Sequence, residues 1–191
     1  MKVLIAVAAA SVALVAGQGV AHAQEAQSLD RLVGLVVDRL ETADTVAAVK
    51  WAGAVRDGGE PVIDDPAREA AIYDAMGALG VERGLPAGWV RAVFEGQIEA
   101  NKLVQRGLVA EWRSQLVSAP VPATDLAGIR PVIDRANTGI VDELSARRAE
   151  LASGDCPARL TGTVLAVAGA RHVDLLHQAA LVRAALPLCE A

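Results

Sequence analysis

Apolar side chains recur at steps of three and four residues along most of the chain, which is the spacing of one face of an α-helix. The first clear stretch covers residues 29–54, and either Ser28 or Asp30 is suited to cap its start. Breaks rich in glycine and proline separate it from later stretches with the same period. The pattern predicts further helices over residues 66–83, 86–112 and 126–151, followed by a helical segment over residues 157–186.

Helix boundaries are marked by residues with capping side chains or fixed backbone angles. Asp65 precedes Pro66, which is the arrangement of an N-cap followed by a first-turn proline, and Gly84 is placed to end that helix. Asp125 is a matching cap for the fourth helix. Pro131 lies early in that helix, where it would either bend the helix or delay its start.

The N-terminal residues have the composition of a cleaved signal peptide. Lys2 supplies a positive charge, residues 3–16 are apolar apart from Ser11, and residues 21–23 read Ala-His-Ala, which predicts cleavage after Ala23. The apolar run is short for a membrane span, so an uncleaved anchor is the less favoured alternative. We expect a mature chain of residues 24–191, folded as one helical domain in the periplasm or outside the cell, with no membrane attachment.

Two cysteines, Cys156 and Cys189, lie in the C-terminal region. In the oxidising compartment that export implies, we expect them to form a disulfide; the alternatives are free thiols or metal ligands, and no CxxC spacing supports a metal site. A straight helix between them would be about 45 Å long, whereas a disulfide needs Cα atoms within about 7 Å. If the cysteines pair, this segment must fold back as a helical hairpin, with its turn at residues 168–170.

The composition favours an all-α fold. The 191 residues are 53% hydrophobic but only 3% aromatic, and the alanine and leucine that supply much of the apolar content are strong helix formers. The formal net charge is -5, which argues against nucleic acid as a partner. An anionic small molecule remains compatible with this charge, because a local basic pocket can override the overall field.

The sequence contains none of the common catalytic signatures: no GxSxG, no P-loop, no GxGxxG and no HExxH. His172 and His177 are close together in the last helical segment, as in a proton relay or a metal pair. No cluster of carboxylates or cysteines accompanies them, so a surface or packing role is favoured for both histidines.

The informative residues are polar side chains set at helical spacings within apolar faces. Arg39 and Lys50 are eleven residues apart, close to three helical turns, so both point to one side of the first helix. Asn101 and Gln105 are four residues apart and share a face of the third helix. Each residue taken alone is explained as a solvated side chain. Further candidates of this kind are Asp65, Arg68 and Arg130.

Together these residues form a series of four motifs. They are RLxxADxVAxxKW over residues 39–51, PVIxDxxRE over residues 61–69, VFExQIxANKxVQ over residues 93–105 and DLxxxRxxID over residues 125–134. The series resembles the AroQ-type chorismate mutases over essentially the whole mature chain. The signal peptide, Arg130 and the two C-terminal cysteines resemble the exported gamma subclass.

The resemblance implies a fold and an activity. The fold is all-α, a helical bundle of the chorismate mutase II type with about six helices and a C-terminal hairpin closed by a disulfide. The activity is that of an isomerase, which converts chorismate to prephenate by an intramolecular Claisen rearrangement. This reaction requires no nucleophile or general base, so the missing signatures are expected. The pocket must hold the substrate in a compact shape and stabilise negative charge on its ether oxygen.

The resemblance also implies a role for each candidate residue. Arg39 and Arg130 would clamp the substrate carboxylates with their planar guanidinium groups. Lys50 would bridge a carboxylate and the ether oxygen, Gln105 would donate to the same ether oxygen, and Asn101 would support a carboxylate. Arg39, Lys50 and Gln105 would thus be the catalytic residues. The remaining residues at the substrate-binding pocket, towards the ring hydroxyl, would be Asp65, Arg68 and Glu69.

Three positions bear on how closely the family pattern is followed. Some relatives carry a glutamate where this chain has Gln105, and a carboxyl group there must be protonated to donate, which ties activity to acid pH. Glutamine donates at any pH, so we expect a flat pH profile. Ile72 stands where some relatives place a polar residue, and Pro131 beside Arg130 could shift that side chain.

The resemblance implies a homodimer that uses no metal and no organic cofactor. Two other functions stay open at this point. An isochorismate pyruvate lyase would use a similar scaffold and a similar cationic pocket, although Gln105 and the exported architecture favour the mutase. A non-enzymatic exported binding module would explain the helices and the disulfide but not the convergence of charged groups, and a large exposed apolar groove in place of a polar pocket would favour it.

Overall fold

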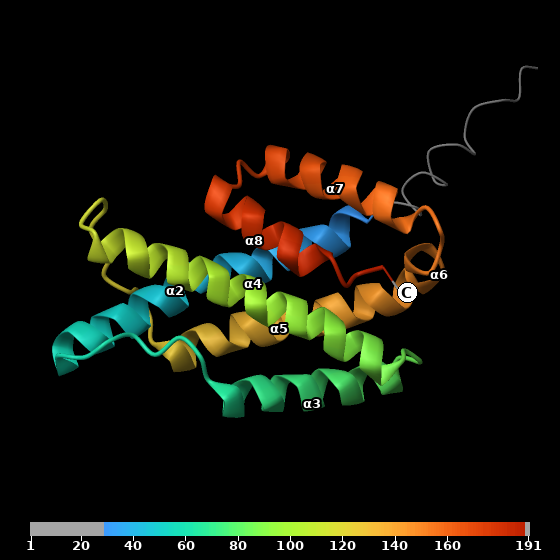
Figure 1. Cartoon of the computed structure of the whole chain (residues 1–191). Helices are drawn as coiled ribbons and strands as arrows, with labels where there is room; N and C mark the ends of the chain where they lie inside the picture. Colours follow the sequence, from blue (N-terminus) through green and yellow to red (C-terminus); the bar gives the residue numbers. More distant parts are fainter. Residues whose placement is uncertain (1–28, 190–191) are drawn as a thin grey trace, which may run out of the picture.

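The structure is a computed structural model that describes residues 29–189. The predicted signal peptide and its cleavage site lie outside the described residues. Within residues 29–189 the chain forms helices and no strand, which confirms the all-α class (Figure 1). No helix in this range is long and apolar enough to cross a membrane. The helices are α2 (Asp30–Asp57), α3 (Pro66–Glu82), α4 (Ala87–Arg113), α5 (Leu126–Ala146), α6 (Arg148–Leu151), α7 (Cys156–Ala170) and α8 (Leu175–Ala185).

Two of the predicted caps are present as hydrogen bonds. The carboxylate of Asp65 accepts from the backbone N–H of Arg68 at 3.1 Å, and that of Asp125 accepts from Gly128 at 2.8 Å. The predicted cap of α2 is wrong for Asp30, because the N-cap position is Leu29 and Asp30 lies inside the first turn. Ser28, the other candidate, lies outside the described residues.

The predicted fourth helix is broken into two parts. α5 ends at Ala146, and α6 begins again at Arg148 after a non-helical residue, Arg147, with φ −108° and ψ 13°. The break lets Leu151 turn into the core, where it is fully buried. Pro131 does not delay the start of α5, because the helix begins directly after Asp125 and runs through the proline.

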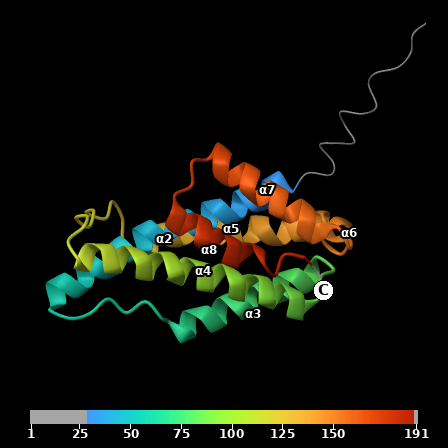
Figure 2. The same ribbon diagram turned by 45° about the horizontal axis from the view of Figure 1, so that its top comes forward.

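α2 lies at the centre of the bundle. It contacts α4, α5, α7 and α8, and its apolar face is buried along its length, with Leu32, Val33 and Val36 all fully shielded from solvent. α3 contacts α4 and α5 on one side of the bundle, whereas α7 and α8 cover the opposite side (Figures 1 and 2). Burial of this continuous apolar stripe is the main stabilising contribution to the fold.

The C-terminal hairpin packs closely on α4 at two glycines. A Cβ atom at Gly107 would come within 2.7 Å of the Leu176 side chain, and one at Gly96 within 2.8 Å of Pro187. The absence of a side chain at both positions therefore allows α8 to approach α4. The indole nitrogen of Trp89 also donates to the carbonyl oxygen of Pro187 at 3.1 Å.

The predicted disulfide and hairpin are both present. Cys156 and Cys189 are bonded, with their Cα atoms 5.9 Å apart. The turn comes slightly later than predicted, because α7 continues through Ala170 and α8 begins at Leu175. His172 adopts a left-handed conformation in this turn, with φ 53°.

Candidate active site

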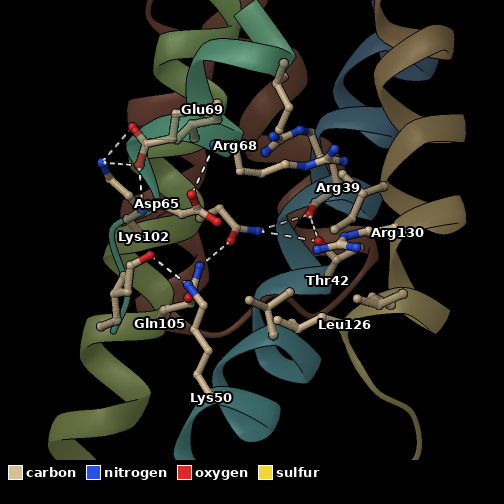
Figure 3. Close-up of a pocket in the computed structure, with 17 residues that line it drawn as sticks. Arg39, Thr42, Lys50, Asp65, Arg68, Glu69, Lys102, Gln105, Leu126 and Arg130 are labelled. Atoms are coloured by element: carbon tan, nitrogen blue, oxygen red, sulfur yellow. Dashed lines mark hydrogen bonds and ion pairs between the residues drawn. The ribbon is translucent and has the colours of Figure 1, made fainter. Parts of the chain in front are cut away.

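A single cavity between α2, α3, α4 and α5 is lined by all eight site residues predicted from the sequence (Figure 3). α2 contributes two of them, three lie at the start of α3, α4 contributes two and α5 one. The cavity therefore brings together residues from 39 to 130 in the sequence. The eight residues are Arg39, Lys50, Asp65, Arg68, Glu69, Asn101, Gln105 and Arg130.

The cavity is positively charged although the chain as a whole is acidic. Five of its lining side chains are lysine or arginine and only two are carboxylates, against a formal net charge of -5 for the whole chain. Apolar side chains form much of the remaining wall and lower the local dielectric, which strengthens the field of the cations. An anion is therefore the ligand that this cavity fits.

Arg39 is the most deeply buried of the cations. Its side chain is about 3% exposed, and its Nε donates to Asn137 Oδ1 at 2.7 Å while its Nη1 donates to the carbonyl oxygen of Gln97 at 2.9 Å. Burial lowers the pKa of Arg39 to about 10, so the group is still charged at neutral pH. Both partners are neutral acceptors, which orient the guanidinium without cancelling its charge.

Lys50 is half-buried on the same face of α2. Its Nζ donates to the carbonyl oxygen of Ile63 at 2.7 Å, in the connection between α2 and α3. Burial lowers the pKa of Lys50, and the nearby carboxylates of Asp65, Asp64 and Glu69 oppose this shift. The ammonium group is thus held at the cavity by a neutral oxygen, as Arg39 is.

Two amide side chains from α4 form a short hydrogen-bond chain to α2. Gln105 Nε2 donates to Asn101 Oδ1 at 2.7 Å, and Asn101 Nδ2 lies 3.5 Å from both the Arg39 carbonyl oxygen and Thr42 Oγ1 (Figure 3). The other amide atom of Gln105, Oε1, is buried and has no hydrogen-bond partner among the described residues. Buried polar atoms are nearly always paired, so this atom marks a place where a bound molecule completes the network.

The start of α3 forms the remaining polar wall. Asp65 caps the helix, and Arg68 Nη2 reaches Asp134 Oδ1 on α5 at 3.4 Å. Glu69 is bound by the ammonium group of Lys102, with its two oxygens 3.2 and 3.3 Å from Nζ. The three predicted residues of α3 therefore lie together, and two of them are held by side chains of other helices.

α5 supplies one cation and an apolar strip. Arg130 lines the cavity from an exposed position, and Pro131 does not remove it from the wall. The strip consists of Leu126, Ile129 and Ile133. Ile72 of α3, where some relatives have a polar residue, also lines the cavity and packs partly against the core.

The structure adds three polar residues for which the sequence motifs predicted no role. Thr42 and Lys102 line the cavity, and Asn137 orients Arg39 from α5. Asn137 lies seven residues after Arg130, or two helical turns, so helical spacing places both on one face. That spacing was the available signal for Asn137. Lys102 stands beside Asn101 within a motif, but two of its three carboxylate partners, Asp64 and Glu69, come from other elements.

Neither histidine lines the cavity. His177 is buried between α8 and α2, where its ring nitrogens lie 3.0 Å from Asp44 Oδ1 and 2.7 Å from Asp174 Oδ2. The hydrogen bond to Asp44 outweighs the effect of burial and raises the pKa of His177 to about 9. His177 is thus a cation that joins two helices, and His172 is exposed in the turn.

An apolar groove lies between α7 and α8, away from this cavity, and Leu160, Val164 and Val182 are among its lining residues. It accompanies the polar cavity and does not replace it. The fold and the cavity together define an all-helical protein with an internal site for an anion that carries hydrogen-bonding groups.

Comparisons with known proteins agree with this description. Residues 24–106 match the family model described as chorismate mutase type II, a range that includes seven of the eight predicted residues and excludes Arg130. The chain is 36% identical to a secreted chorismate mutase of Mycolicibacterium smegmatis over 184 residues, 95% of this chain and 98% of the relative. It is 29% identical to a secreted chorismate mutase of Mycobacterium tuberculosis over 175 residues, covering 92% and 85% of the two chains.

Solved structures give the same result. The chorismate mutase of Burkholderia phymatum superimposes with a TM-score of 0.78 at 36% identity, covering 87% of this chain and 99% of the other. That of Burkholderia thailandensis gives a TM-score of 0.77 at 28% identity, covering 84% and 98%. The chain belongs to the chorismate mutase type II family.

Proposed function

We propose that the protein converts chorismate to prephenate in the cavity between α2, α3, α4 and α5. The observation that carries this proposal is the buried guanidinium of Arg39, whose two hydrogen-bond partners are both neutral. A buried charge without a counterion is costly, and a ligand carboxylate offsets that cost when it binds. Chorismate has two carboxylates, which suits a cavity with several cations.

The reaction needs positioning and charge stabilisation only. Within one molecule the ether C–O bond to the ring breaks, while the methylene carbon of the enolpyruvyl group forms a new C–C bond to the ring. The ether oxygen becomes the ketone oxygen of prephenate, and no proton is transferred in this step. Fixed donors lower the barrier by holding the two reacting ends together and by stabilising negative charge on the ether oxygen.

The cations and amides divide this work in the proposed mechanism. Arg39 binds one carboxylate, and Arg130 binds the other from α5. Lys50 exchanges its hydrogen bond with the Ile63 carbonyl for bonds to a carboxylate and to the ether oxygen. Gln105 donates to the same ether oxygen through the second hydrogen of Nε2, whose first hydrogen is donated to Asn101.

The remaining polar residues orient the substrate. Asn101 supports a carboxylate and holds the amide of Gln105. Glu69 accepts a hydrogen bond from the ring hydroxyl, and Arg68 lines that end of the cavity. Asp65 fixes the first turn of α3 through its capping bond, so it orients Arg68 and Glu69, which lie in that turn.

We further propose that the enzyme acts outside the cytoplasm as a homodimer. The predicted signal peptide and the disulfide support export, and two similar proteins are named secreted chorismate mutases. All eight predicted site residues, Arg130 included, meet in one cavity within a single chain, which supports one complete site in each subunit. Sedimentation of the mature protein measures the subunit number directly.

The test is turnover of chorismate by the purified mature protein, residues 24–191. Loss of ultraviolet absorbance follows consumption, and acid conversion of the product to phenylpyruvate identifies prephenate. Arg39→Ala and Lys50→Ala should each lower kcat/KM at least a hundredfold, the effect of losing a buried charged hydrogen bond. Arg56→Ala is the matched control, because Arg56 is an exposed residue of the same helix that pairs with its neighbour Asp57.

Two results would reject the proposed reaction, and a third would reject its location. A folded, disulfide-bonded protein that does not consume chorismate would show that the cavity serves another anion. Release of pyruvate from isochorismate, without prephenate formation from chorismate, would assign the lyase reaction. If Arg39→Ala and Arg56→Ala lowered kcat/KM equally, the protein would still be a chorismate mutase, but its active site would not be this cavity.

A further inference from the structure

Lys102 on α4 is surrounded by carboxylates at the edge of the cavity. Its Nζ lies 2.6 Å from Glu99 Oε1, 3.1 Å from Asp64 Oδ1 and 3.2 Å from Glu69 Oε1. The lysine side chain is only 12% exposed, and of its partners Glu69 is 19% exposed whereas Glu99 and Asp64 are 38% and 57% exposed, so the contact with Glu69 is the most shielded from solvent. Its donors are occupied by the protein's own carboxylates, unlike those of Arg39 and Lys50, which meet neutral oxygens. Lys102 is therefore not a free cation for the substrate.

The three carboxylates come from three different elements. Glu99 precedes Lys102 by one turn on α4, Glu69 lies in the first turn of α3, and Asp64 belongs to the connection that enters α3. Only Glu69 and Lys102 of this group line the cavity (Figure 3). Lys102 thus joins α4 to the part of α3 that carries the polar wall.

The contact with Lys102 is the main one that sets the position of the Glu69 carboxylate, since the other donor to it, the backbone N–H of Asp65, lies further away, 3.4 Å from Oε1. Both oxygens of Glu69 lie within 3.3 Å of Nζ, and the Glu69 side chain is 19% exposed. A carboxylate that shares one ammonium through both oxygens has little freedom to rotate away. It remains at the cavity wall, where a ligand hydroxyl can donate to it.

Asp64 has a second anchor that does not depend on Lys102. Arg106, one turn further along α4, binds Asp64 Oδ1 at 2.8 Å. The neighbouring residue, Ile63, supplies the carbonyl oxygen that holds Lys50. Loss of Lys102 should therefore leave the connection and Lys50 in place and affect mainly Glu69.

We propose that Lys102 is a positioning residue that acts through Glu69 and sets the affinity for the ring hydroxyl of the substrate. The inference rests on the proposed function, since it concerns the same cavity. Lys102 touches neither reacting atom. It holds the one carboxylate that receives the hydroxyl, and its effect falls on substrate binding rather than on the chemical step.

Lys102→Met tests this inference, because methionine keeps an unbranched side chain and removes the charge. KM for chorismate should rise about tenfold with kcat within about threefold of wild type, the pattern of lost uniform binding. Lys102→Arg keeps the cation and should restore most of the affinity. Glu99→Gln is the control, since Glu99 binds Lys102 but does not line the cavity, and its KM should stay within about twofold of wild type.

A double-mutant cycle shows whether Lys102 acts through Glu69. In a Glu69→Gln background, Lys102→Met should raise KM by less than about twofold, because the positioned group is already gone. A chorismate analogue with hydrogen in place of the ring hydroxyl should bind Lys102→Met and wild type equally well. If Lys102 were purely structural, Lys102→Met would instead lower the unfolding temperature and leave KM for chorismate unchanged. The effects of the two substitutions would then be additive in the cycle.

The outcomes separate this inference from the proposed function. Wild-type turnover with an unchanged KM in folded Lys102→Met overturns the role of Lys102 alone. If the wild type binds chorismate without turnover, the proposed mutase activity fails, and the dissociation constant replaces KM in the same cycle. If it neither binds nor converts chorismate, both proposals are overturned.

Discussion

The Nε atom of Arg39 lies 2.7 Å from Oδ1 of Asn137, a residue 98 positions later in the chain. Asn137 is about 1% exposed, so the bond joins buried groups of α2 and α5. An amide oxygen can accept from a guanidinium without carrying a charge of its own. The pair therefore holds Arg39 in one orientation and leaves its positive charge to be neutralised by a ligand.

Asn137→Asp should weaken substrate binding while preserving the fold. Aspartate has nearly the shape of asparagine but would supply Arg39 with a permanent carboxylate partner, which competes with the substrate carboxylate. KM for chorismate should rise about tenfold or more, with an unfolding temperature equal to or above that of wild type. Steady-state kinetics and thermal unfolding measure the two effects. Gln115→Glu adds a negative charge at an exposed site and serves as the control; an unchanged KM in Asn137→Asp would contradict the role given to Arg39.

Gln105→Glu should tie activity to acid pH. The side chain at position 105 is about 4% exposed, and its Oε1 has no donor among the described residues. A carboxyl group there donates to the ether oxygen only while it is protonated. Above the pH at which it ionises, kcat/KM should fall about tenfold for each pH unit, whereas wild type should vary little. Rate profiles from pH 4 to pH 9 make the comparison, and identical profiles would remove Gln105 from the mechanism.

His177 should stabilise the fold at neutral pH and lose this effect in alkali. Its pKa is about 9 in the folded chain, against an ordinary value of 6.5, because Asp44 and Asp174 stabilise the protonated ring. A raised pKa contributes stability that is complete below about pH 6.5 and disappears as the pH rises through about 9. The contribution is at most on the order of 3 kcal/mol, because solvent screens the two partner carboxylates, which are 54% and 63% exposed.

Urea unfolding of wild type and His177→Gln measures this contribution. The difference in unfolding free energy between the two proteins should narrow by roughly 1–3 kcal/mol from pH 6 to pH 10. Turnover near neutral pH should be similar in both, since His177 does not line the cavity. A difference that stays constant with pH would mean that the ring contributes by packing and not by its charge.

Removal of the disulfide should reduce stability more than activity. The bond closes a loop with a sequence separation of 33 residues, which in the chain-entropy model corresponds to about 3–4 kcal/mol. Neither cysteine lines the cavity, so the reduced protein should keep its turnover at temperatures where it is folded. Thermal unfolding and kinetics of a Cys156→Ala/Cys189→Ala double variant test both points. A large loss of activity in a folded variant would show that the hairpin supports the cavity.

The helical pattern predicted much of this fold because the bundle follows local rules. The caps at Asp65 and Asp125 and the end of α3 before Gly84 depend on neighbouring residues alone, and they are confirmed. The break at Arg147 was not predicted, because it depends on where Leu151 meets the core. The turn of the hairpin was predicted at residues 168–170, but α7 continues to Ala170. A glycine alone does not end a helix, so the position of this turn also depends on tertiary packing.

The sequence predicted the site residues whose helical spacing places them on a shared face of one helix. Arg39 with Lys50, and Asn101 with Gln105, are of this kind, and all four line the cavity. The contacts of Lys102 with Asp64 and of His177 with Asp44 join distant segments, and only the packing of the helices reveals them. The roles in catalysis remain predictions, because they need a bound substrate.

The cross-link between Cys156 and Cys189 encloses the turn between α7 and α8. Residues 171 and 172 of this turn are exposed to solvent, where an extracellular protease can reach the backbone. A single cut there would leave both fragments covalently joined through the cystine, with α8 still seated on α4. The disulfide would thus keep the cleaved hairpin attached to the bundle, which is an advantage for a protein that is exposed to proteases outside the cytoplasm.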